Sequence, residues 1–148
     1  MSISASIDVK LASQKSNVES VIIIKKLIDF GWSYCNSGKI MYLPLGDNDD
    51  YDWRIIDEID EVDLFNVLDQ KRNMGETIGI MMTWKNTGVG GDFLFWTDGS
   101  ISINLTINRK TIESNGIEIT DINWYLQKIL PCFAKDYIIE LYTYEEHV

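Results

Sequence analysis

The sequence predicts an α+β fold in which a mainly antiparallel sheet of about six strands packs against three helices, in the order β-α-β-α-β-β-β-α-β. Apolar and polar residues alternate, a period typical of strands, in segments 2–11, 77–84 and 101–107. Apolar residues recur at helical spacing in segments 17–30, 60–72 and 121–130. The 148 residues, 45% of them hydrophobic, contain no linker or repeat, which indicates one domain over residues 1–148.

The first strand is followed by a helix that ends near Phe30. Ser16 and Glu19 have the spacing of a capping box at its start, and Gly31 suits the position after its last turn. The β-branched run 21–24 leaves a strand open as an alternative at this point. A strand is then expected over residues 39–45, where Pro44 would place its end at a sheet edge or exit.

The second helix is expected to begin near Asp60, because carboxylates are favoured at the positive end of the helix dipole. Lys71 and Arg72 suit its last turn, and Gly75 suits its end. The residues before it, 46–52, have the composition of a loop.

Three consecutive strands are expected to form an antiparallel meander over residues 77–84, 93–97 and 101–107. A glycine-rich turn over 85–92 joins the first two, and Asp98-Gly99 is the signal of a two-residue type I′ hairpin. Asn115-Gly116 closes either a further small hairpin or a loop.

The last part of the chain predicts the third helix and a final strand. Thr120 can cap the helix, and the strand over residues 137–144 closes the sheet. Residues 145–148 are expected to fray.

Charge is concentrated in the segment 47–63, DNDDYDWRIIDEIDEVD. It holds nine carboxylates and one base, Arg54, which leaves −8 of the −10 that the whole chain carries. Like charges at this density repel each other, so the segment must be solvated, bind a cation or face a basic partner.

The composition argues against several classes of protein. With only 13 basic residues, the chain is not expected to bind nucleic acid or an anionic membrane surface. It has no signal-peptide pattern and no apolar run of the ~20 residues that span a membrane, so a cytoplasmic location is expected. Cys35 and Cys132 form no C-x-x-C motif and are expected to be free buried thiols.

No motif points to a metal, a cofactor or a catalytic centre, and we expect no enzyme activity. An EF-hand loop counted from Asp47 has Tyr51 where a ligand oxygen is needed and Asp52 where a glycine is needed. The glycine loop 87–91 precedes a strand instead of the helix that a phosphate loop requires. The one histidine, His147, is next to the last residue, which disfavours a Cys–His nucleophile. A looser site for a divalent cation stays open.

The acidic segment is the candidate partner-binding site. Tyr51 and Trp53 are proposed anchors, since aromatic residues are frequent interface hot spots, and the carboxylates would steer a basic partner. A Trp53 that instead covers the sheet is the alternative. The expected partner-binding residues are Asp47, Asp49, Asp50, Tyr51, Asp52, Trp53, Asp57, Glu58, Asp60 and Glu61.

Three segments carry a resemblance to a known family: GETIGIMMTW (75–84), GGDFLFWTDGSISINLTINRK (90–110) and TDINWYLQKILP (120–131). They resemble immunity proteins of bacterial contact-dependent growth inhibition and related polymorphic-toxin systems. The resemblance covers about the C-terminal half and, more weakly, the acidic segment. It implies a small, non-enzymatic cytosolic protein that binds and neutralises one cognate toxin. The charge of the acidic segment favours a toxin with a basic surface, such as a nuclease, while a pore former or another enzyme stays open.

Two other functions remain open from the residues alone. The first is a small-molecule-binding domain or enzyme that uses clustered carboxylates in a cleft, which predicts buried acids with shifted pKa values. The second is an acidic adaptor or nucleic-acid mimic that binds a basic partner other than a toxin.

Overall fold

The computed structural model describes residues 4–12, 18–57 and 61–147, apart from the side chains of residues 61 and 62. Within these residues nine strands form one sheet: β1 (Ser4–Ala12), β2 (Trp32–Ser33), β3 (Cys35–Asn36), β4 (Lys39–Tyr42), β5 (Arg54–Asp57), β6 (Ile78–Trp84), β7 (Gly90–Phe95), β8 (Ser100–Ile107) and β11 (Ile138–His147). A separate hairpin consists of β9 (Thr111–Ser114) and β10 (Ile117–Thr120). The helices are α1 (Ser20–Phe30), α2 (Glu61–Asn73), α3 (Ile122–Ile129) and a 3₁₀ turn, η1 (Leu130–Cys132).

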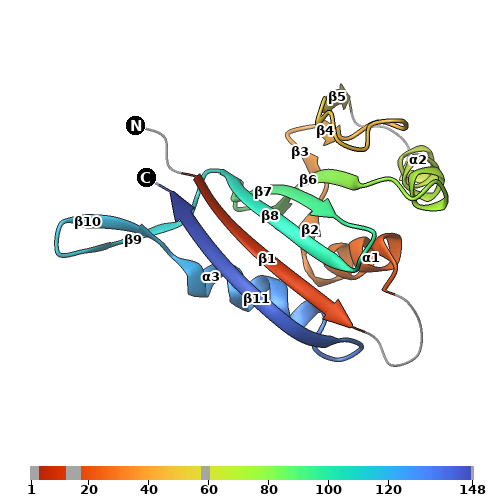
Figure 1. The fold of residues 1–148 in the computed structure, drawn as a ribbon. Helices are drawn as coiled ribbons and strands as arrows, with labels where there is room; N and C mark the ends of the chain where they lie inside the picture. Colours follow the sequence, from red (N-terminus) through yellow and green to blue (C-terminus); the bar gives the residue numbers. More distant parts are fainter. Residues whose placement is uncertain (1–3, 13–17, 58–60, 148) are drawn as a thin grey trace.

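The sheet has the order β11-β1-β8-β7-β6-β4-β3, with β2 beside β6 and β5 beside β4, and its pairs are antiparallel. The predicted α+β class with three helices and a large antiparallel sheet is therefore confirmed. The sheet has more strands than the six expected, because the short strands β2, β3 and β5 also pair. Helices α1 and α3 lie on one side of the long strands, while α2 contacts α1 and β6 (Figure 1).

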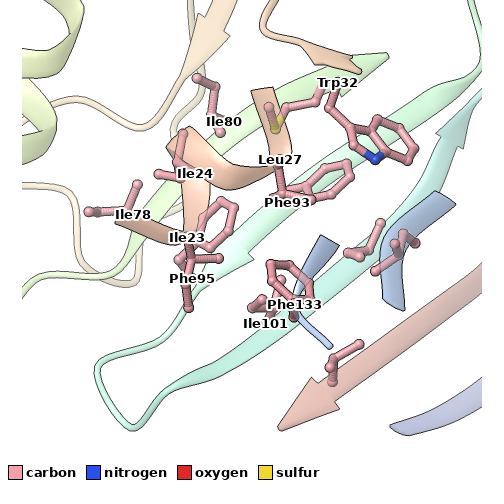
Figure 2. Close-up of a cluster of buried hydrophobic side chains, with 14 of the residues drawn as sticks. Ile23, Ile24, Leu27, Trp32, Ile78, Ile80, Phe93, Phe95, Ile101 and Phe133 are labelled. Carbon is pink, nitrogen blue, oxygen red and sulfur yellow. The ribbon is translucent and has the colours of Figure 1, made fainter. Parts of the chain in front are cut away.

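The core fills the space between the sheet and the helices. Figure 2 shows Ile23 and Leu27 of α1 close to Phe93 and Phe95 of β7. All of these side chains are almost completely buried. Trp32 closes one side of the core, with its ring centroid 5.1 Å from that of Phe93 and its indole N–H donating to the Lys128 carbonyl at 2.8 Å. The run 21–24 is thus helical. Burial of Val21, Ile23 and Ile24 in the core stabilises the helix by more than the β-propensity of these residues disfavours it.

The predicted capping box at the start of α1 is wrong. The helix begins at Ser20, and Glu19 occupies the N-cap position with an extended backbone and no capping hydrogen bond from its side chain. Its carboxylate is instead paired with Arg72 of α2. Ser16 lies outside the described residues. Gly31 ends the helix with a φ of +140°, as the sequence predicts.

The predicted hairpin at Asp98-Gly99 exists, but its turn is not type I′. The Trp96 N–H donates to the Ser100 carbonyl at 3.0 Å across a three-residue loop. Gly99, with a φ of +87°, has the left-handed conformation that such loops need. Asn115 and Gly116 do have the two positive φ values of a type I′ turn, and they close the β9–β10 hairpin. This hairpin projects away from the rest of the molecule (Figure 1).

The ends of three elements differ from their predicted positions. The strand expected over 39–45 ends at Tyr42. The last strand continues to His147, whose pairing with Ser4 prevents the expected fraying of residues 145–147. The glycine-rich turn ends at residue 89, because Gly90 and Gly91 belong to β7.

Gly90 and Gly91 are required by the close approach of neighbouring strands. A Cβ at Gly90 would lie 1.9 Å from the Met82 carbonyl oxygen, and one at Gly91 would lie 1.8 Å from that of Asn104. The register between β7 and β8 also shifts at this point, which is typical of a β-bulge.

Gly91→Ala is expected to lower the free energy of unfolding by more than about 3 kcal/mol, because the added methyl group meets rigid backbone. Gly116→Ala is the control, since its φ of +79° is unfavourable for alanine but its Cβ would have open space. It should cost only about 1 kcal/mol. Urea denaturation measures both, and equal losses would contradict the close-approach explanation.

Candidate functional site

The structure divides the acidic segment into parts with different roles. Residues 46–53 form a loop, Arg54–Asp57 form strand β5, and α2 begins at Glu61, close to the predicted start. Glu58, Asp60 and the side chain of Glu61 lie outside the described part of the chain. Strand β5 was not predicted, because the surrounding charges hide the strand character of Ile55 and Ile56.

Asp47 supports the loop from inside. Its side chain is buried, with an exposed fraction of 6%. Its carboxylate accepts hydrogen bonds from the backbone N–H groups of Asp50 at 3.0 Å, Tyr51 at 3.0 Å and Asp52 at 2.7 Å. A carboxylate with three such donors is satisfied within the chain. Asp47 is therefore not available as a surface contact for a partner.

The other three loop aspartates point to solvent. Asp49, Asp50 and Asp52 are exposed, and none of them forms an ion pair within the described residues. Tyr51 lies between them with 43% of its surface exposed and a φ of +54°, a conformation that bulky residues rarely adopt. The hydrogen bond from its N–H to Asp47 helps to hold this conformation. The loop therefore displays three carboxylates and one aromatic ring in a defined shape.

Lys71 of α2 connects this loop to helix α2 through hydrogen bonds. It is completely buried, and its ammonium group donates to the carbonyl oxygens of Pro44 at 2.8 Å and Asp47 at 2.7 Å and to Glu76 Oε1 at 3.2 Å. Glu76 Oε1 also accepts from the N–H of Gly46 at 2.9 Å. Three oxygens thus compensate the buried charge of Lys71, as a buried ammonium group requires.

Two further contacts attach the loop to the sheet. The Asn48 side-chain oxygen accepts from the N–H of Thr77 at 2.7 Å. Trp53 lies over Gly79 of β6, where an added Cβ would be 2.8 Å from the ring and 2.6 Å from Leu43. The half-buried Trp53 therefore covers the sheet, which is the alternative that the sequence left open. Tyr51 remains the exposed aromatic residue of the loop.

Strand β5 continues the surface beyond the loop. It pairs with β4, and its exposed Asp57 forms an ion pair with Lys39. The hydrogen bond from the Lys39 ammonium group lowers the pKa of Asp57, with the attraction between the two charges as a further cause. Because both groups are solvent-exposed, this pair contributes little to stability.

An apolar groove next to β5 was not predicted from the sequence. It has a volume of about 270 Å³, and its lining includes Tyr34, Met41, Ile55, Met81, Thr83 and Ile107. These residues come from five separated segments of the chain. The alternation in residues 77–84 indicated only that Met81 would face away from Ile80, so the tertiary structure was needed to find the groove.

A larger cavity, of about 480 Å³, lies near the start of α1 and the end of α2. Two carboxylates among the described residues line it, and both are paired: Glu19 with Arg72, and Glu76 with Lys71. The cavity therefore offers no unpaired described carboxylate for the chemistry that the enzyme alternative needs.

The described residues form no metal-binding cluster. No group of three or more His, Cys, Asp or Glu side chains among them could hold a metal ion. Both cysteines are free and half-buried. Burial raises the pKa of the Cys132 thiol to about 12, which makes it a poor nucleophile at neutral pH. His147 lies 3.5 Å from Glu145.

Comparisons with protein-family models, curated proteins and solved structures found no match to this chain. In the described part of the chain, no helix is long and apolar enough to cross a membrane.

Lys71→Met is expected to lower the free energy of unfolding by about 3–5 kcal/mol, because Glu76 would stay buried without its cation. Adding Glu76→Gln to this variant should recover part of the loss. A double-mutant cycle by urea denaturation measures the coupling. A loss below about 1 kcal/mol in the single variant would contradict the role of Lys71.

Asp47→Ala is expected to cost about 2 kcal/mol, because three backbone N–H groups lose their acceptor. Asp49→Ala is the matched control in the same loop and should change stability by less than about 0.5 kcal/mol. Thermal or urea unfolding of both variants tests this difference. Equal stabilities would mean that Asp47 does not hold the loop.

Proposed function

We propose that this chain is an immunity protein that binds and neutralises a cognate bacterial toxin domain in the cytosol. The observation that supports this most strongly is the loop 46–53. It presents Asp49, Asp50 and Asp52 to solvent without ion pairs among the described residues, while buried groups hold its backbone.

The rigidity of the loop matters for affinity. A flexible acidic segment would lose conformational entropy on binding, whereas a loop already held by Asp47 and Lys71 loses less. Its exposed carboxylates would attract a basic partner over several ångströms and raise the association rate. Tyr51 would then supply a central contact between the charged groups.

A basic toxin surface fits this arrangement. Nucleases need clustered Lys and Arg to bind the phosphates of their substrates, so a nuclease domain is the toxin class that the acidic loop matches best. In that case the loop would occupy the surface that otherwise binds nucleic acid. An acidic adaptor or nucleic-acid mimic would use the same loop, and the gene neighbourhood separates the two, since an immunity protein is expected beside its toxin gene.

The test is the association rate with the toxin domain encoded directly upstream. Changing Asp49, Asp50 and Asp52 together to lysine should slow association about ten- to a hundredfold at low salt and much less at high salt. Stopped-flow or biosensor kinetics give the rates, and protection of cells that produce the toxin domain gives the function.

The control variant carries lysine at Glu113, Glu118 and Glu140, three exposed acids outside the acidic segment. It changes the net charge by the same amount, so an equal effect of both variants would show that the loop is not the site. If the parent protein binds no toxin domain encoded beside it, the proposed function is overturned.

A further inference from the structure

The apolar groove beside β5 is built by the face of the sheet opposite to α1. Met41 pairs with Ile55, while Tyr42, the next residue, pairs with Ile80. Since neighbouring residues on a strand point to opposite faces, Met41, Ile55 and Met81 share the face that Ile80 does not. Ile80 is buried in the core with α1 (Figure 2), so this row points away from that helix.

The groove leaves apolar surface exposed to water. Ile55 has an exposed fraction of 63%, and Met41, Met81 and Ile107 are only partly buried. Two of these side chains are methionines, which adapt their shape to an incoming group more easily than branched residues do. An apolar concavity with several such side chains is typical of an interaction site, whereas a single exposed isoleucine is not.

The charges near the groove select the kind of occupant. Lys39 also lines it, but its charge is compensated by Asp57. Beside Ile55, Arg54 is exposed and forms no ion pair among the described residues, and the same holds for Asp49, Asp50 and Asp52 just before it. The net charge next to the groove is therefore negative. The surroundings therefore favour an apolar side chain that comes from a cationic surface.

We propose that this groove receives an aliphatic or aromatic side chain of the same basic protein partner that the acidic loop steers. This inference rests on the proposed function and adds its apolar anchor: the carboxylates set the association rate, and the groove sets the lifetime of the complex. The two surfaces are continuous, because residues 52–55 run directly from the loop into the groove wall. A second copy of the chain is a poorer occupant, since each copy carries a charge of −10 and would repel the other.

Ile55→Ser and Ile107→Ser test the groove from two separate strands. Each is expected to raise the dissociation constant for the upstream-encoded toxin domain at least about tenfold, mainly through faster dissociation. The matched control is Ile117→Ser, because Ile117 is also a strand isoleucine with an exposed fraction of 63%, but it lies on the projecting β9–β10 hairpin. Thermal unfolding of all three variants confirms that each is folded.

The outcomes separate this inference from the proposed function. If the parent binds but Ile55→Ser and Ile107→Ser dissociate as slowly as the parent, the groove is not the anchor, although the immunity function stands. If only Ile117→Ser weakens binding, the hairpin is the anchor and the inference is overturned. If sedimentation of the protein alone shows a dimer that Ile55→Ser dissociates, the occupant is a second copy and the inference also fails.

Discussion

The buried ammonium group of Lys71 is the interaction on which the acidic surface depends. It joins the end of α2 to Pro44 just before the loop, to Asp47 in the loop and to Glu76 before β6. A lysine is suited to this position, because three donors on one nitrogen can serve three oxygens, two from residues 44–47 and one from Glu76. The Lys71 ammonium group thus holds the backbone of the loop, whose exposed aspartates face solvent.

The two faces of the sheet have different surroundings. One face packs against α1 and α3 and contains most of the buried aromatic and branched side chains. The opposite face, near β4 to β6, bears Trp53 over Gly79 and the groove beside Ile55. The acidic loop leaves the sheet at this place, so a charged surface and an apolar one lie next to each other. The proposed binding of a basic protein would use both parts of this combination.

Much of the fold could be predicted from local patterns, and the failures have physical causes. Alternation and helical spacing correctly located the long strands and all three helices, because those patterns reflect burial of one face. The capping box at Glu19 failed because Arg72, distant in sequence, offered its carboxylate a charged partner. The short strand β5 was missed because charged residues flank its two isoleucines, and its pairing with β4 is not visible in the local pattern. Gly90 and Gly91 suggested a turn, whereas close strand packing requires them.

For the candidate site, the sequence by itself determined that negative charge is concentrated in residues 47–63 and that Tyr51 and Trp53 lie within it. Only the tertiary structure decided which of these residues are exposed. Asp47 and Asp49 are the same amino acid two positions apart, yet one is buried under three N–H groups and the other is exposed. That difference, like the groove of Ile55, Met81 and Ile107, depends on contacts between segments far apart in the chain, which local sequence patterns do not encode.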